Sequence, residues 1–282
     1  MLRIIILINL ILSSLSGNDS DGYRFFCNDY LSQEKVSMEM DVLTEFQTGA
    51  FSFQGTFSGL INTSIVDHNL PGGRVKVIQE WSNVIGLNKR NDEVKPNHDA
   101  TRLNGTQFIV IIDSTGKTES IEGNNDTARE MIDESQSFSS IFGSENYFYP
   151  FGPDSLRKVG DVWSYSSEKD LGAQVGSDGY SGHQQVTTTV TFKKIKVKKG
   201  KQIAILKMKQ IISENGTTVT WDDTYDVKME GEFVGTAQFN ITDGFVKLYK
   251  TSGSLKGLRT NLSNDHVWNY VQNFDLKMKR KK

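Results

Sequence analysis

Large apolar side chains alternate with small or polar ones over much of this chain. In FSFQGTFSG, residues 51–59, the odd positions hold three phenylalanines and two glycines. MEGEFVG, residues 229–235, repeats the order apolar, glycine, phenylalanine, glycine at alternate positions. A period of two is typical of a β-strand with one buried and one solvated face. The glycines on the apolar face predict strong curvature, because a sheet can curl where side chains are missing. They are Gly55, Gly59, Gly231 and Gly235.

The longest alternating pattern covers residues 219–241, with apolar residues and glycines at most odd positions. Asp223 interrupts this apolar face: it is the polar group of a pocket, or it lies where the strand emerges into solvent or where the register changes at a bulge. Short turn signals separate this pattern from similar ones and predict an antiparallel meander of hairpins. They are Thr115-Gly116, Lys199-Gly200, Asn215-Gly216 and Asp243-Gly244.

One segment has helical spacing. Thr127 and Glu130 fit a capping box at a helix start, and Gly143 follows the segment. The apolar stripe, which we expect to cover a face of the sheet, consists of Met131, Ile132, Phe138 and Phe142. A loop with Pro150 and Pro153 comes next, and a new strand is expected over residues 162–165.

The fold class predicted from these patterns is mainly β: a strongly curved antiparallel meander, either barrel or half-barrel, with one helix between two similar halves. FQGTFSG precedes GGRVKVI in the first half, and MEGEFVG precedes DGFVKLY in the second. The expected divisions are a signal peptide at 1–16, a first β half at 17–125, the helix and proline loop at 126–158, and a second β half at 159–282.

The amino terminus has the plan of a secretory signal peptide. One arginine precedes an apolar run at residues 4–12, and Ser14 and Ser16 fit the small positions before a cleavage site. The run is too short to span a membrane, so we expect a mature chain from about Gly17, without a transmembrane segment, in the periplasm or secreted. Cys27 is the only cysteine and cannot form an internal disulfide.

Charge argues against a nucleic-acid partner, because the formal net charge is −2 and the pI is about 6.1. The basic run at residues 193–201 alternates lysines with Ile195 and Val197, as on the solvated face of a strand. Seven Asn-x-Ser/Thr triplets occur, which would be glycosylation acceptors in a eukaryotic secretory pathway. A chain rich in Asn, Ser and Thr also produces them by chance, and several lie in turns, so they leave glycosylation open. They begin at Asn18, Asn62, Asn104, Asn125, Asn215, Asn240 and Asn261.

No pattern in the sequence indicates catalysis, a metal site or a cofactor. The four histidines are scattered singly, with no His-x-x-x-His pair, and no Gly-x-Ser-x-Gly motif is present. They are His68, His98, His183 and His266. We therefore expect a protein that is not an enzyme, although catalytic groups can also converge without a local motif.

The segment FYPFGPDSLRKVGDVWSYS resembles uncharacterised exported bacterial all-β proteins, in which a proline loop leads into Val-Gly-Asp-x-Trp. Val159, Gly160, Asp161 and Trp163 carry this resemblance, which implies export and a β-rich fold but no activity. The predicted plan is also similar in architecture to periplasmic half-barrel carriers of lipids or lipoproteins.

The apolar face is the predicted binding surface, for a hydrophobic small molecule, a lipid or a lipid-modified partner. The alternative is an envelope-associated interaction or structural domain whose interior is filled by side chains and which holds no ligand. The candidate lining residues are Phe51, Phe53, Phe57, Ile61, Trp221, Val227, Met229, Phe233 and Phe239.

Overall fold

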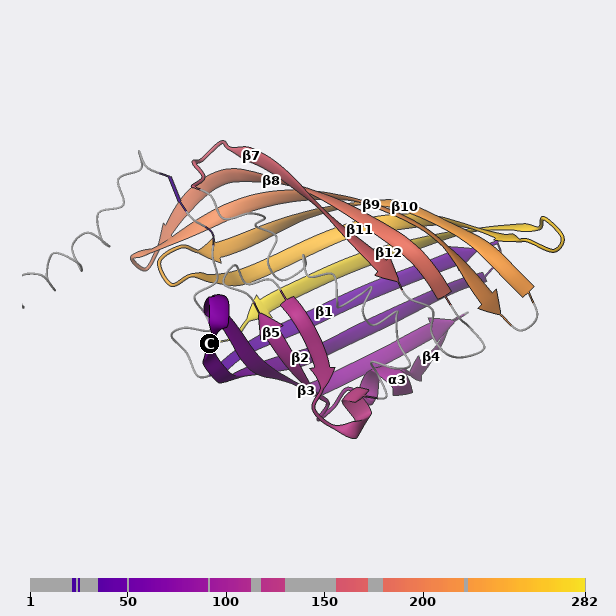
Figure 1. Cartoon of the computed structure of the whole chain (residues 1–282), viewed down its shortest axis with the longest axis horizontal. Helices are drawn as coiled ribbons and strands as arrows, with labels where there is room; N and C mark the ends of the chain where they lie inside the picture. Colours follow the sequence, from indigo (N-terminus) through magenta and orange to yellow (C-terminus); the bar gives the residue numbers. More distant parts are fainter. Residues whose placement is uncertain are drawn as a thin grey trace, which may run out of the picture.

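The computed structural model describes residues 22–23, 25, 35–49, 51–90, 92–112, 118–129, 156–171, 180–220 and 223–281. It confirms the predicted fold class: a mainly β protein built around one antiparallel sheet of twelve strands (Figure 1). The sheet is open, because β6 and β7 stand at its two ends and do not pair with each other in the described part of the chain.

The strands follow one another as long hairpins. In the first half they are β1 (Lys35–Thr48), β2 (Phe51–Leu70), β3 (Arg74–Arg90), β4 (Glu93–Pro96), β5 (Gln107–Ile112) and β6 (Thr118–Gly123), with short helices η1 (Pro71–Gly73) and α3 (His98–Thr101). In the second half they are β7 (Val162–Leu171), β8 (Tyr180–Lys198), β9 (Lys201–Thr220), β10 (Asp223–Asn240), β11 (Phe245–Asn261) and β12 (Val267–Arg280).

The two halves meet in the middle of the sheet, where the first long strand pairs with the last. The strand order is β6-β5-β3-β2-β1-β12-β11-β10-β9-β8-β7, with β4 paired to β3. β1 lies against β12 from the pair Met38–Arg280 to the pair Gln47–Val271. We call this pairing the seam, and Figure 1 shows it between the indigo and yellow strands.

The two hairpins that carry the glycine patterns occupy equivalent places. β2 lies four positions from β10 in the sheet, and β3 lies four positions from β11. Because neighbouring strands are antiparallel, strands four positions apart run in the same direction and each hairpin advances toward the same edge. The similarity between the two halves therefore extends from the sequence to the placement of the hairpins.

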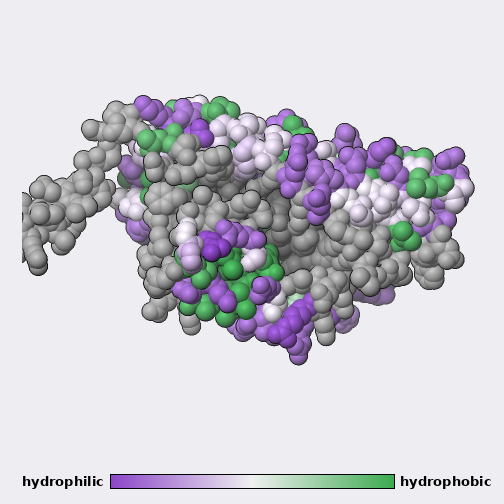
Figure 2. Space-filling model, viewed as in Figure 1, coloured by the Kyte–Doolittle hydropathy of each residue, from purple (hydrophilic) through white to green (hydrophobic). Residues whose placement is uncertain are grey.

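Side chains on one face of the sheet, the core face, are buried. A cluster of buried residues runs along it from Val75 of β3 to Phe192 of β8 and includes Met40, Leu206 and Tyr249. Figure 2 shows apolar residues also gathered over β5, whose sequence is QFIVII, next to the edge strand β6.

The glycines of the core face are covered by bulky cross-strand partners. A Cβ atom added to Gly231 would lie 2.5 Å from the Leu255 side chain and 2.4 Å from the Ser254 carbonyl oxygen. At Gly253 the same atom would lie 2.7 Å from the ring of Phe233. The missing side chains thus make room for neighbours on the next strand, which is a known device for packing curved sheets.

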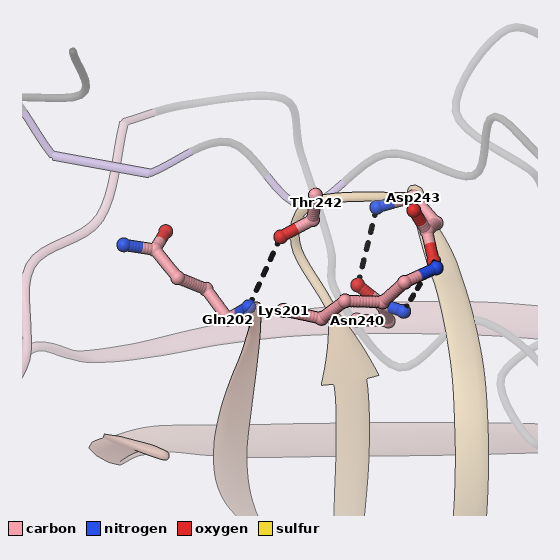
Figure 3. A network of polar contacts seen from close by, with 5 residues as sticks. All are labelled: Lys201, Gln202, Asn240, Thr242 and Asp243. Atoms are coloured by element: carbon pink, nitrogen blue, oxygen red, sulfur yellow. Dashed lines mark hydrogen bonds and ion pairs between the residues drawn. The ribbon is translucent and has the colours of Figure 1, made fainter. Parts of the chain in front are cut away.

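Two predicted turns are confirmed. Lys199 and Gly200 connect β8 to β9, both with positive φ, as a type I′ turn requires. The turn from β10 to β11 contains Asp243 and Gly244 and is held by Asn240, whose amide nitrogen donates to the Asp243 carboxylate at 2.7 Å (Figure 3). Lys201 forms an ion pair with the same carboxylate. Thr115-Gly116 lies outside the described residues.

The turn predicted at Asn215-Gly216 is wrong. β9 continues through both residues to Thr220, and β10 begins at Asp223. Gly216 pairs with Val227 on one side and with Gly182 on the other. The partner strands keep supplying hydrogen bonds and cross-strand contacts beyond Gly216, and these outweigh the local turn preference.

The predicted helix begins where expected, but a different residue caps it. Residues 126–129 are helical, and the Asn125 side chain accepts a hydrogen bond from the Ala128 backbone nitrogen at 3.0 Å. Asn125, two positions before Thr127, is therefore the N-cap. Glu130 and the apolar stripe of Met131, Ile132, Phe138 and Phe142 lie outside the described residues. Among the helices that the structure describes, none is both long and apolar enough to cross a membrane.

Candidate functional site

A groove of about 1100 Å³ crosses the sheet on the face opposite the core. We call this face the polar face. The groove touches eight neighbouring strands, from β3 at one end to β8 at the other. Long, twisted strands bend along their length, and this bending hollows one face of a sheet.

Two rows of directly paired residues form the floor of the groove. The first row runs Ile85, Ser58, Asp41, Lys277, Lys250, Thr236, Lys207, Thr191 across successive strands. The second row runs Leu87, Thr56, Leu43, Asp275, Ser252, Val234, Lys209, Thr189. Successive strands lie about 4.8 Å apart, so each row presents one side chain at about that interval.

The charge of the groove is unequal along its length. Five lysines line it against two aspartates, although the chain as a whole is slightly acidic. All five lysines lie on β8, β9, β11 and β12. They are Lys193, Lys207, Lys209, Lys250 and Lys277.

Two of these lysines are neutralised by carboxylates. Lys277 donates to Asp41 at 2.6 Å, a hydrogen bond that raises the pKa of Lys277. Lys209 pairs with Glu232 at 2.7 Å. Lys193, Lys207 and Lys250 are exposed, and none of the carboxylates in the described residues forms an ion pair with them.

The opposite end of the groove is apolar. Ile85 and Leu87 of β3 are 61% and 40% exposed, which is unusual for large aliphatic side chains side by side on one face. Leu43 of β1 extends this surface toward the seam. The groove therefore joins an end with exposed aliphatic side chains to a half that carries the lysines, in which Val234 of β10 is also exposed.

The residues predicted to line a ligand site lie mainly in the core. Ile61, Val227, Phe233 and Phe239 are at most 6% exposed. Ile61, Phe233 and Phe239 belong to the clusters of buried apolar side chains. Phe53 and Met229 are half-buried on the same face. Only Phe57, between Thr56 and Ser58 on β2, is among the groove residues. The side chain of Phe51 and all of Trp221 lie outside what the structure describes.

Polar residues gather at one end of the core face. Glu214 is 5% exposed and accepts a hydrogen bond from the Gln184 amide nitrogen at 2.7 Å. Burial and the negative charge of Glu214 raise the pKa of Tyr270 to about 12. The Arg259 guanidinium lies 4.0 Å from the centre of the Tyr225 ring. Asp223 is the first residue of β10, and its carboxylate accepts a hydrogen bond from the Ser263 hydroxyl at 3.0 Å.

The segment from Val159 to Trp163 forms a turn that starts β7. Gly160 has a φ of 99° and donates its backbone N–H to Phe192 at 2.7 Å. The Asp161 carboxylate accepts from the Lys158 backbone nitrogen at 2.7 Å. Trp163 is buried and stacks on Phe25 with ring centres 6.0 Å apart. These contacts give the motif a structural role, anchoring both the strand and the amino-terminal segment.

The histidines with described side chains do not come together. His183 is exposed at the β7–β8 edge, where its Nδ1 lies 2.8 Å from Asp170. Its pKa is raised by that hydrogen bond. Among the residues whose positions are described, no group of three His, Cys, Asp or Glu side chains could hold a metal ion.

Several of the glycosylation-like triplets are occupied by structural hydrogen bonds. Asn104 bonds both the N–H and the carbonyl of Val84, at 2.7 Å and 3.0 Å. Asn240 and Asn261 are buried in turns. Asn125 caps a helix, as described above. These hydrogen bonds give the four asparagines a structural role in turns and at a helix start.

No protein-family model matches the chain, and no curated protein matches it in sequence. A Bacteroides fragilis protein described as exported, with a YmcC-like fold, has a TM-score of 0.25 and 8% identity, covering 92% of this chain and 100% of its own. Pseudomonas aeruginosa OccK5 has a TM-score of 0.25 and 7% identity, covering 88% and 99%. Similarities this low carry no functional argument, so any function must be argued from the groove itself.

Proposed function

We propose that this protein is an exported, non-enzymatic binding protein whose groove on the polar face holds a hydrophobic or amphiphilic ligand. The observation that carries the proposal is the volume of about 1100 Å³ combined with exposed aliphatic side chains at one end. Ligand sites of small molecules have volumes of about 300 to 1000 Å³ and apolar linings with a few polar groups, which this groove approaches. No cofactor is required.

Binding is tested by displacement of a lipophilic fluorophore, Nile red, from the purified protein. Substituting Ile85→Ser and Leu87→Ser together removes the exposed apolar end without touching the core, so it should weaken Nile red binding at least about tenfold. The matched control is Val197→Ser with Val219→Ser, two exposed valines elsewhere in the sheet. Equal binding by both variants and the parent would place the fluorophore outside the groove and contradict the proposal.

Export is supported by the short apolar run at residues 4–12 and the small residues after it. Amino-terminal sequencing of the protein from cells should find a chain that starts near Gly17. Retention of Met1 on membrane-bound material would contradict it.

The second candidate is an interaction domain without a ligand, whose interior is packed by its own side chains. The burial of Ile61, Phe233 and Phe239, which are at most 3% exposed, supports it. In that case a partner would add a strand to an edge such as β7.

A further inference from the structure

The two ends of the groove differ in chemistry, and that difference specifies a ligand. Along the first row, Ile85 stands at the β3 end, whereas Lys277, Lys250 and Lys207 stand on β12, β11 and β9. A uniformly apolar molecule would leave Lys250 and Lys207 without an anionic partner, whereas Lys277 already pairs with Asp41. A small inorganic anion would leave Ile85 and Leu87 exposed to water.

The lysines of the groove are placed so that they repel one another. Lys250 is directly opposite Lys277, and like charges in directly opposed positions destabilise a sheet. Asp41 neutralises Lys277 only. Lys207 lies two strands from Lys250, with Thr236 between them, so their Cα atoms are about 10 Å apart.

Ammonium groups on flexible stems can converge across that distance onto one anionic group. The hydroxyl of Thr236, between the two lysines, is a further donor for its oxygens. Bound there, an anion would relieve the repulsion and form charge-assisted hydrogen bonds, which are stronger than neutral ones.

The apolar end lies within reach of the tail of the same molecule. From β11 to β3 there are four interstrand spacings, which is about 19 Å. A long-chain amphiphile covers that distance with its head at Lys250 and its tail over Leu43, Ile85 and Leu87.

We propose that the groove binds a single-chain amphiphile with an anionic head group, a carboxylate or a phosphate, held by Lys207 and Lys250. This inference rests on the proposed function, because it names the ligand class of the same groove. The head lies on the β9–β11 side and the tail points toward β3.

The experiment measures binding to the purified protein by titration calorimetry, below the micelle concentration, with dodecyl phosphate, dodecyl maltoside and inorganic phosphate as probes. Dodecyl phosphate should bind with one molecule per chain, and the other two should bind at least about tenfold more weakly. Shortening the tail to decyl phosphate removes two methylenes and should weaken binding by about tenfold.

The charge test is Lys207→Gln with Lys250→Gln, which should weaken binding of dodecyl phosphate by at least about tenfold. The matched control is Lys196→Gln with Lys256→Gln, two exposed lysines outside the groove that lower the net charge equally. The control should bind as the parent does. Circular dichroism of both variants should match the parent, because all four side chains are exposed.

Each of the other possible results contradicts a specific part of the proposal. Equal binding of dodecyl phosphate and dodecyl maltoside, abolished in both cases by Ile85→Ser with Leu87→Ser, refutes the anionic head but keeps the proposed function. Inorganic phosphate as tight as dodecyl phosphate refutes the amphiphile. Equal losses in the test and control variants indicate general surface attraction and refute the site. Absence of amphiphile and Nile red binding together refutes the proposed function as well.

Discussion

Gly231 shows how a single missing side chain sets the packing of two strands. It faces Leu255 on β11, while the neighbouring pair reverses the order, with Phe233 on β10 facing Gly253 on β11. In each of these two pairs a large apolar side chain on one strand faces a glycine on the other. The two strands therefore contribute alternately to a single layer of apolar side chains. Gly235 and Thr251 continue the arrangement. The sequence identified the empty positions, but their partners depend on a register that local patterns do not determine.

We expect Gly231→Val to lower the free energy of unfolding by at least about 1 to 3 kcal/mol, because the new Cβ would lie 2.4 Å from the Ser254 carbonyl oxygen. Urea denaturation measures the change. Gly55→Val should cost less, since the nearest atom is the Thr44 hydroxyl oxygen at 3.2 Å. Thr236→Val, at an exposed position of the same strand, is the control and should leave the midpoint almost unchanged. A Gly231→Val midpoint at or above that of the parent would show that this face is not crowded.

His183 predicts a small pH effect at the β7–β8 edge. Its hydrogen bond with Asp170 raises its pKa above the ordinary 6.5, so the protonated form is favoured in the folded state. The resulting stabilisation is present below the unfolded pKa and disappears as the pH rises through the folded pKa. A proton NMR titration should give a midpoint above 6.5 for His183, and Asp170→Asn should lower it. An unchanged midpoint in that variant would mean that Asp170 does not hold the imidazole in solution.

At the scale of elements, turns could be predicted only where the chain had no competing partner. Lys199-Gly200 and Asp243-Gly244 form turns because neighbouring strands end there. Asn215-Gly216 has the same local chemistry but lies inside a strand, because β8 and β10 both continue to pair with it. The groove could not be predicted from local sequence patterns either, because Lys207 and Lys250 are 43 positions apart in the sequence. Only the pairing of both strands with β10 brings these lysines into one row.

The aromatic contacts at the start of β7 join three distant parts of the chain. Phe25 contacts Trp163, Phe192 and Phe239, with ring centres 5.2 to 6.0 Å apart. We expect Phe25→Ala to destabilise the protein by about 3 to 5 kcal/mol, since a buried ring is removed from the core. Urea denaturation of Phe25→Ala and of Val197→Ala, an exposed control, measures the difference. Equal midpoints would show that the amino-terminal segment does not pack on the sheet.

At the scale of the whole molecule, the sheet has two chemically different faces. On the core face, Met40, Leu206 and Tyr249 are almost inaccessible to solvent. The polar face carries the groove with its exposed lysines and aliphatic residues. The sequence predicted that one face would be apolar and the other polar, and it favoured the apolar face for binding. Our proposal instead places the ligand on the polar face, where the described residues line a groove.

The seam between β1 and β12 determines when the sheet can be completed during folding. Lys281 bonds to Glu39 across 242 positions of the chain, so the centre of the sheet joins strands that are far apart in the sequence. Each hairpin can form as it is synthesised, but the two halves can join only after β12 has been made. Pairing over such a separation carries a large loop-closure entropy and slows folding. A chain with this connectivity keeps the edges of β1 and β12 open until these two strands pair with each other.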